Sequence, residues 1–130
     1  MELREPALLT DEYRRVLAGR GAAHVYNAAT AMPEPGDQAD RIPPDAAPFA
    51  VVRLLLKPGT SYGERREEFV PFDRIVDPDP GIRRQVVSII RAAAERPVYV
   101  LVNNKAEGCA PATIRAIAEM LVTEQVTGDG

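Results

Sequence analysis

Four short segments of the chain have the hydrophobic pattern of β-strands. Residues 49–56 (FAVVRLLL) and 98–102 (VYVLV) are almost continuously apolar, which is typical of strands that a parallel sheet buries on both faces. Residues 22–27 form a shorter candidate that ends in a polar side chain, and residues 2–6 form a brief extended segment that Pro6 stops. The pattern therefore predicts a parallel sheet of about four strands.

Amphipathic helices are expected between these strands. Thr10 has the position of an N-cap for a helix that Gly21 ends, and Asp79 followed by Pro80 marks the start of another. A final helix begins at Pro111. Apolar residues at helical spacing predict its buried stripe, which consists of Ile114, Ile117, Ala118 and Leu121.

The order of these elements predicts an α/β fold with right-handed crossovers and flanking helices. Residues 30–48 are rich in proline and have no apolar period, so we expect a long loop there. Residues 60–78 are expected to be irregular, with a short helical turn at 63–69. We expect one domain over residues 1–125 and a flexible tail over 126–130.

Composition and charge narrow the classes of protein. The chain has 130 residues, of which 45% are hydrophobic and 27% are charged, the balance of a soluble globular domain. Its net charge of −3 makes nucleic acid an improbable partner without excluding it. There is no apolar run of the roughly 18–20 residues that a membrane span needs, so no membrane is expected. A single cysteine, Cys109, allows no internal disulfide and no cysteine-cluster metal site; we expect a cytoplasmic protein without metal or cofactor.

Three segments together carry a resemblance to a known family. They are Glu2–Pro6 (ELREP), Phe49–Tyr62 (FAVVRLLLKPGTSY) and Val98–Pro111 (VYVLVNNKAEGCAP), and Pro71–Ile75 (PFDRI) adds to them. In this order and spacing they resemble the YecE-like family (domain of unknown function 72) from residue 2 to about residue 122.

The resemblance implies a TIM-type barrel. Such barrels typically need about 250 residues, whereas this chain has 130 residues and about four strand candidates. We therefore expect the C-terminal half of a YecE-like barrel, without the first half. Asn27 stands where many members have Asp, and Val102 where many have Phe, which indicates a divergent branch.

Polar residues at the expected strands and their ends are the candidates for a site, because parallel sheets bind ligands at the carboxyl ends of their strands. Guanidiniums such as those of Arg4 and Arg53 bind phosphate or carboxylate with two hydrogen bonds, and asparagine amides orient a ligand without titrating. Glu2 and Glu107 are the candidate catalytic acids or bases. The ligand-binding candidates are Arg4, Asn27, Arg53, Asn103 and Asn104.

Each candidate also has a purely structural explanation. Glu2 and Arg4 share one strand face and can pair with each other. Arg53 lies among apolar residues and needs a partner, which can be a fixed carboxylate or a ligand. Asn103 and Asn104 can cap the loop that they begin.

The candidate Glu107 has a structural explanation as well, since a carboxylate next to a glycine is more typical of a loop than of a base. Other polar residues are expected outside any site. His24 has no second histidine at metal-ligand spacing and is expected to pack inside a strand. Cys109 is expected to be structural, and the pairs Arg65–Arg66 and Arg83–Arg84 are expected on solvated helix faces.

Three functions remain open at this stage. The first is an anion site with hydrolase-like chemistry on a phosphorylated or carboxylated small molecule. The second is a binding or nucleic-acid-associated module that uses the same residues without turnover. The third is an incomplete barrel half without activity, which would self-associate through an exposed edge at Glu2–Arg4 or be complemented by another chain.

Overall fold

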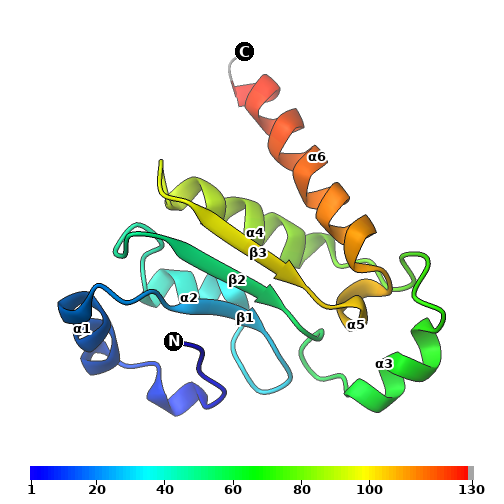
Figure 1. The fold of residues 1–130 in the computed structure, drawn as a ribbon, viewed down its shortest axis with the longest axis horizontal. Helices are drawn as coiled ribbons and strands as arrows, with labels where there is room; N and C mark the ends of the chain where they lie inside the picture. Colours follow the sequence, from blue (N-terminus) through cyan, green and yellow to red (C-terminus); the bar gives the residue numbers. More distant parts are fainter. Residues whose placement is uncertain (129–130) are drawn as a thin grey trace.

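A three-stranded parallel sheet forms the centre of the molecule in the computed structural model, which describes the backbone of residues 1–128 and the side chains of residues 1–123 (Figure 1). The strands are β1 (Val25–Ala28), β2 (Ala50–Leu54) and β3 (Val98–Val102), and they lie side by side in chain order. The predicted α/β fold with a parallel sheet is confirmed, with three strands instead of about four. The sheet is open, which is consistent with part of a TIM-like fold.

Helices α2 (Pro35–Arg41), α4 (Pro80–Ala92) and α6 (Ala110–Gly128) lie on one face of this sheet, and α3 (Tyr62–Phe69) and α5 (Asn104–Glu107) lie at its carboxyl edge (Figure 1). The 3-10 helix η1 (Pro6–Leu8) and α1 (Asp11–Arg20) precede β1 and lie on its side of the sheet (Figure 1). The predicted caps are confirmed, since the side chains of Thr10 and Asp79 accept hydrogen bonds from the backbone amides of Tyr13 and Ile82.

The register of the sheet decides which side chains share a face. Asn27 of β1, Arg53 of β2 and Leu101 of β3 are Cα partners across the two strand pairs, so they project from the same face. The residues next to them, such as Val52, project from the opposite face and join the buried core beneath α2, α4 and α6 (Figure 1).

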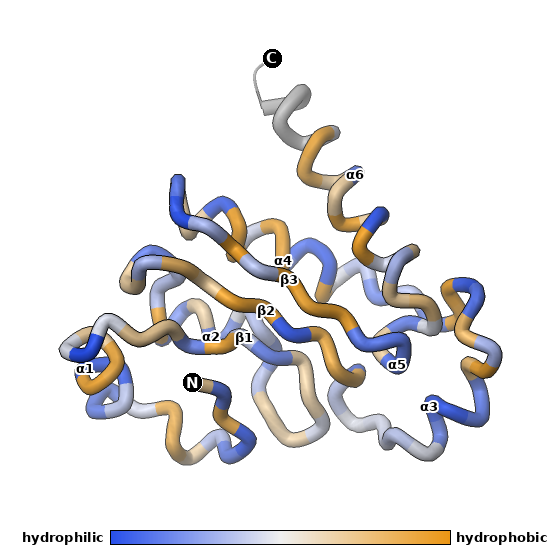
Figure 2. The backbone as a smooth tube through the Cα atoms, in the orientation of Figure 1, coloured by the Kyte–Doolittle hydropathy of each residue, from blue (hydrophilic) through white to orange (hydrophobic). Residues whose placement is uncertain are grey.

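The face that carries Arg53 is not covered by a helix layer. Tyr99 and Leu101 of β3 are 57% and 50% exposed on it, and the Phe49 ring meets the Tyr99 ring edge to face. Figure 2 shows that hydrophobic residues predominate along β2 and β3. The expectation of strands buried on both faces is therefore wrong, because only alternate residues of β2 and β3 are turned toward the helices.

The expected first strand at residues 2–6 is also wrong. Only Met1 pairs with the sheet: its amine donates to Ala23 O, and Val25 N donates to Met1 O. At Leu3 the carbonyl accepts from the Asn27 side chain at 2.9 Å instead of from a backbone amide, so the ladder ends there.

The proline-rich segment 30–48 contains a helix where a long loop was expected. Pro35 begins α2. The two buried residues of this helix are Pro35 and the polar Gln38. A helix that packs through an amide leaves no apolar period in the sequence. The predicted helical turn at 63–69 is confirmed as α3.

The expected buried stripe of the last helix is only partly buried. Ile117 is buried, but Ile114 and Ala118 are exposed. The reason is the course of α6, which leads away from the sheet, so the stripe lines an open groove with Ile90 and Val100 (Figure 1).

No described helix has the length and apolar character required to cross a bilayer. Self-association and complementation by another chain stay predictions. A flexible tail over 126–130 also stays a prediction, because it falls on residues whose side chains, and for 129–130 the backbone, lie outside the described part.

Replacement of Gly108 tests the packing at the carboxyl edge of the sheet. Gly108 has φ +127°, and a Cβ on it would lie 2.6 Å from Arg74 O and 2.9 Å from Val76 N. We expect Gly108→Ala to lower the free energy of unfolding by about 3 kcal/mol in urea denaturation. Gly19→Ala, in α1 with nothing near its Cβ position, should instead be neutral or stabilising by up to about 1 kcal/mol. Equal effects of the two changes would contradict this prediction.

Candidate functional site

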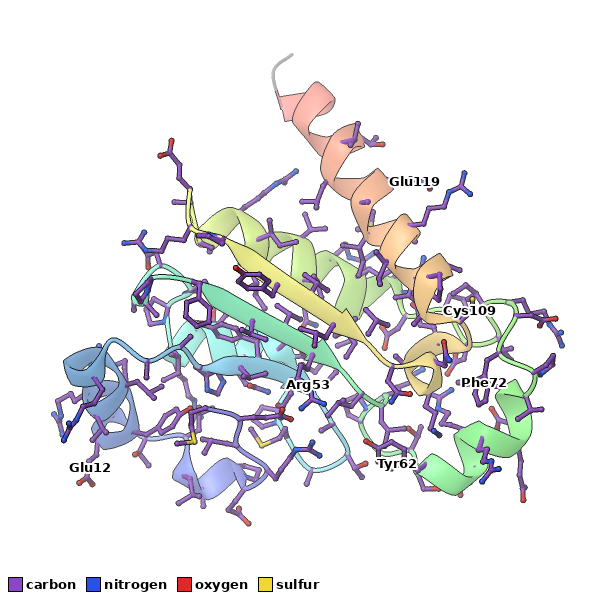
Figure 3. The ribbon with its side chains drawn as sticks, in the orientation of Figure 1. Glu12, Arg53, Tyr62, Phe72, Cys109 and Glu119 are labelled. Atoms are coloured by element: carbon purple, nitrogen blue, oxygen red, sulfur yellow. The ribbon has the colours of Figure 1, made fainter. Side chains whose placement is uncertain are left out.

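Four of the predicted site residues meet around one carboxylate, and we call them the Glu2 cluster: Glu2, Arg4, Asn27 and Arg53. Arg53 Nη1 donates to Glu2 Oε1. Arg4 Nε lies 3.0 Å from Glu2 Oε2, and Asn27 Nδ2 donates to the same oxygen at 3.0 Å. Figure 3 shows Arg53 extending from β2 toward the N-terminal segment. The two guanidiniums therefore converge on a side chain of the protein itself.

The sheet register and the N-terminal segment together assemble this cluster. Asn27 and Arg53 are Cα partners, so their side chains leave the sheet next to each other. The Asn27 amide then holds the N-terminal segment through Leu3 O as well as through Glu2. In this way Asn27 of β1 places Glu2 and Arg4, from the start of the chain, next to Arg53 of β2.

The charges of the cluster do not cancel. Burial alone raises the pKa of the Glu2 carboxyl, but hydrogen bonds from Asn27 and Arg53 and the charges of Arg4 and Arg53 outweigh it and hold this pKa below its ordinary value of 4.5. Glu2 is thus ionised at neutral pH and offsets only one of the two arginines. The side chains of Arg4 and Arg53 are 57% and 38% exposed, so one net positive charge faces solvent.

A buried chain of hydrogen-bonded side chains holds Asn27, one member of the cluster, in place. Gln38 Nε2 donates to Asn27 Oδ1 at 3.0 Å and to Asn27 O at 2.9 Å. Since the Gln38 amide nitrogen is used in this way, its Oε1 is the acceptor for His24 Nε2 at 2.9 Å. His24 Nδ1 is then the acceptor for the Tyr13 hydroxyl at 2.7 Å. His24 is therefore a packed, neutral histidine, and the Asn27 amide is fixed in one orientation.

Asn103 and Asn104 lie at the end of β3 as capping residues. Asn103 Oδ1 accepts from Lys105 N at 2.8 Å and begins α5, and Asn104 Oδ1 accepts from Ala110 N at 2.8 Å. Their side-chain carbonyls are thus used in local turns. Neither side chain contacts the Glu2 cluster among the hydrogen bonds of the described residues.

Glu107 is held apart from the cluster by other partners. Its carboxylate accepts from Arg83 Nε and Nη2 at 2.9 and 2.8 Å, from Asp79 N at 2.6 Å and from Thr113 Oγ1 at 2.7 Å. Burial alone raises its pKa, but the hydrogen bonds from Arg83, Thr113 and Asp79 and the charge of Arg83 outweigh burial and lower the pKa below 4.5. Such a carboxylate has little tendency to take up a proton, which argues for a structural role.

Comparison with known proteins identifies the family. A family model described as "Protein of unknown function DUF72" matches residues 1–129. The chain belongs to the DUF72 family. The match extends over essentially the whole chain, so the expectation that the chain is the C-terminal half alone is not borne out. Neither a search of curated proteins nor a search of solved structures gives a match.

Sequence reasoning on this DUF72 protein missed two side chains that organise its polar groups. Gln38 belongs to a segment that was expected to be a loop, and no apolar pattern marks it. Arg83 was expected on a solvated helix face, which is wrong, because it pairs with Glu107. The available signal was the Asp79–Pro80 cap. It predicts where α4 begins, and therefore that Arg83 lies in the first turn of this helix, close to Asp79.

A hollow of about 570 Å³ lies between α2 and α4, lined by Gly36, Asp40 and Arg84 among others, and none of the seven candidate residues lines it. Within the described residues no group of three or more His, Cys, Asp or Glu side chains could hold a metal ion.

A substitution at Glu107 measures how much its hydrogen bonds stabilise this family member. We expect Glu107→Gln to lower the free energy of unfolding by about 3 kcal/mol, because it leaves the Arg83 guanidinium without its carboxylate. Glu119→Gln is the matched control, since Glu119 pairs with Arg115 on the exposed surface of α6. That change should cost about 0.5 kcal/mol or less in the same denaturation experiment. Similar losses in both variants would contradict the assigned role.

The pKa of His24 predicts how stability depends on pH. Burial, with a smaller contribution from the N-terminal charge, lowers this pKa below 6.5 and outweighs the hydrogen bond with Gln38 and the charge of Glu2. The unfolded chain then binds a proton that the folded chain does not. The free energy of unfolding should be highest above about pH 6.5 and fall as the pH drops toward about 5. His24→Gln should flatten the curve in this window, where Glu2 and Glu107 stay ionised; an unchanged slope would contradict the prediction.

Proposed function

We propose that this protein binds the oxyanion group of a small molecule, a phosphate or a carboxylate, at Arg4 and Arg53. The observation that carries the proposal is the convergence of two partly exposed guanidiniums on the single carboxylate of Glu2. That arrangement keeps both arginines in position and leaves one positive charge in excess.

The hydrogen-bonding capacity of the two arginines supports this proposal. A guanidinium has five N–H donors. Glu2 accepts from Nε of Arg4 and from Nη1 of Arg53. Among the described residues the other donors of both side chains have no acceptor, and a phosphate or carboxylate can accept two or more of them. Asn27 contributes indirectly, because it fixes the carboxylate that holds both guanidiniums.

Binding without turnover is favoured over hydrolase-like chemistry. A general base works best with a pKa near the operating pH, and the pKa values of Glu2 and Glu107 are both shifted the other way. Glu107 also has four hydrogen-bond donors directed at it. Hydrolysis of a phosphoester with Glu2 as the general base is therefore the second candidate function, after binding without turnover. The net charge of −3 argues against a nucleic-acid polymer as the ligand.

The test is a titration of the protein with inorganic phosphate and with acetate, followed through the arginine Nε–H resonances in NMR spectra and through calorimetry. We expect the Arg53 resonance to shift in a saturable way. Arg53→Ala should weaken the binding at this site at least about tenfold, since it removes charge-assisted hydrogen bonds.

The control for this test is Arg115→Ala on the exposed surface of α6, which should bind the anions as the unchanged protein does. An Arg53 resonance that stays constant with both anions would contradict the proposal. Equal affinity of the Arg53→Ala and Arg115→Ala proteins would contradict it as well.

A further inference from the structure

Arg65 of α3 is the one arginine of the described residues with guanidinium nitrogens that are both buried and without a hydrogen-bond partner. The residue was expected on a solvated helix face, but only 3% of it is exposed. Its Nη1 donates to Asp77 Oδ2 at 2.9 Å, and its Cζ lies 4.7 Å from the centre of the Phe69 ring. The side chain is therefore held in place by an acid at one end and an aromatic ring beside it.

The opposite edge of the same guanidinium is unsatisfied. Arg65 Nε and Nη2 are buried and have no acceptor among the described residues. A buried donor of a charged group without an acceptor is costly, and more so than a buried donor of a neutral group. Glu64, Glu67 and Glu68 belong to the same helix, but they are exposed and none accepts from Arg65. This edge therefore needs an acceptor that the described residues do not provide.

Arg83 shows in the same molecule what such an edge binds. The Nε and Nη2 atoms of Arg83 donate to the two oxygens of the Glu107 carboxylate at 2.9 and 2.8 Å. These are the two nitrogens that are unsatisfied in Arg65. Their parallel N–H groups match the spacing of two oxygens on a carboxylate or a phosphate.

The surroundings of Arg65 are suited to an anion. Lys57 Nζ lies 3.6 Å from the oxygen of Asp77 that Arg65 also contacts, so one acid is shared by two cations and one positive charge remains. Lys57 follows the end of β2, and the carboxyl ends of parallel strands are where such sheets bind ligands. A third cation, Lys105, lies over the Tyr62 ring at the start of α3 (Figure 3 labels Tyr62).

We propose that the Nε–Nη2 edge of Arg65 binds a carboxylate or phosphate group, with Lys57 as the neighbouring cation. This site is separate from the Glu2 cluster and shares no residue with it. Because the edge is covered, binding displaces the atoms above it. Residues 55–61, which precede α3, contain no helix or strand, so this end of α3 can shift without breaking a regular element. On the other side of α3, the amides of Val76 and Asp77 stay bonded to Glu107 O.

The test follows the Arg65 Nε–H resonance during titration with inorganic phosphate and, separately, with acetate. We expect a saturable shift with at least one of them, and the anion that binds more tightly defines the ligand class. In a chain that carries Arg53→Ala, calorimetry should still detect this site. Adding Arg65→Lys should weaken that binding at least about tenfold, since a lysine keeps the charge but has no two-pronged edge.

Arg66→Lys, one residue further along α3 and exposed, is the control and should leave the affinity unchanged. An Arg65 resonance that does not move with either anion overturns the proposal even if the variants fail to fold. Equal affinity of the Arg65→Lys and Arg66→Lys chains overturns it too. A shift at Arg53 without one at Arg65 contradicts this site alone, and the reverse result contradicts only the function proposed for the Glu2 cluster.

Discussion

The carboxylate of Glu107 is the contact on which the carboxyl side of this fold depends. It accepts four hydrogen bonds, which come from the first turn of α4, the backbone just before it, and α6. The backbone carbonyl of the same residue accepts from Val76 and Asp77. One buried residue of the short helix α5 therefore fixes where α4 begins, how α6 leaves the sheet and where Asp77 lies. Asp77 in turn accepts a hydrogen bond from the guanidinium of Arg65, so the position of this buried arginine also depends on Glu107.

Three arrangements of arginine and acid coexist in this small chain and differ in how completely charge is matched. Arg83 donates two hydrogen bonds to the carboxylate of Glu107, and its position is structural. Arg4 and Arg53 share Glu2 and retain donors on the open face of the sheet. Arg65 shares Asp77 with Lys57, and two of its three guanidinium nitrogens have no acceptor among the described residues. The three arrangements thus differ in how completely each arginine is paired, a difference that is visible only in the distances between side chains.

The sequence allowed the elements to be predicted wherever apolar residues define them. β2, β3 and α4 follow from apolar runs, a helical period and the Asp79–Pro80 cap. The prediction failed where polar side chains replace backbone or apolar contacts. Gln38 makes α2 a packed helix without an apolar stripe, and the Asn27 amide takes the place of the ladder at Leu3.

The rule that parallel sheets bind ligands at the carboxyl ends of their strands grouped four residues into one predicted site, and their side chains do meet. They are Glu2, Arg4, Asn27 and Arg53. The same rule included Asn103 and Asn104, whose side chains cap local turns, because the end of a strand is also the start of a helix. The burial of Arg65 and Arg83 was missed, since each depends on an acid that is 12 or 24 residues away in the chain.

The uncovered face of the sheet has a thermodynamic consequence. Tyr99 and Leu101 keep their apolar surface in water in the folded chain, so this surface contributes little to the free energy of folding. Any molecule that binds this face only in the folded state adds a stabilisation that grows with its concentration, by about 1.4 kcal/mol for each tenfold excess over its dissociation constant. The melting temperature of this chain is then a property of the solution as well as of the sequence.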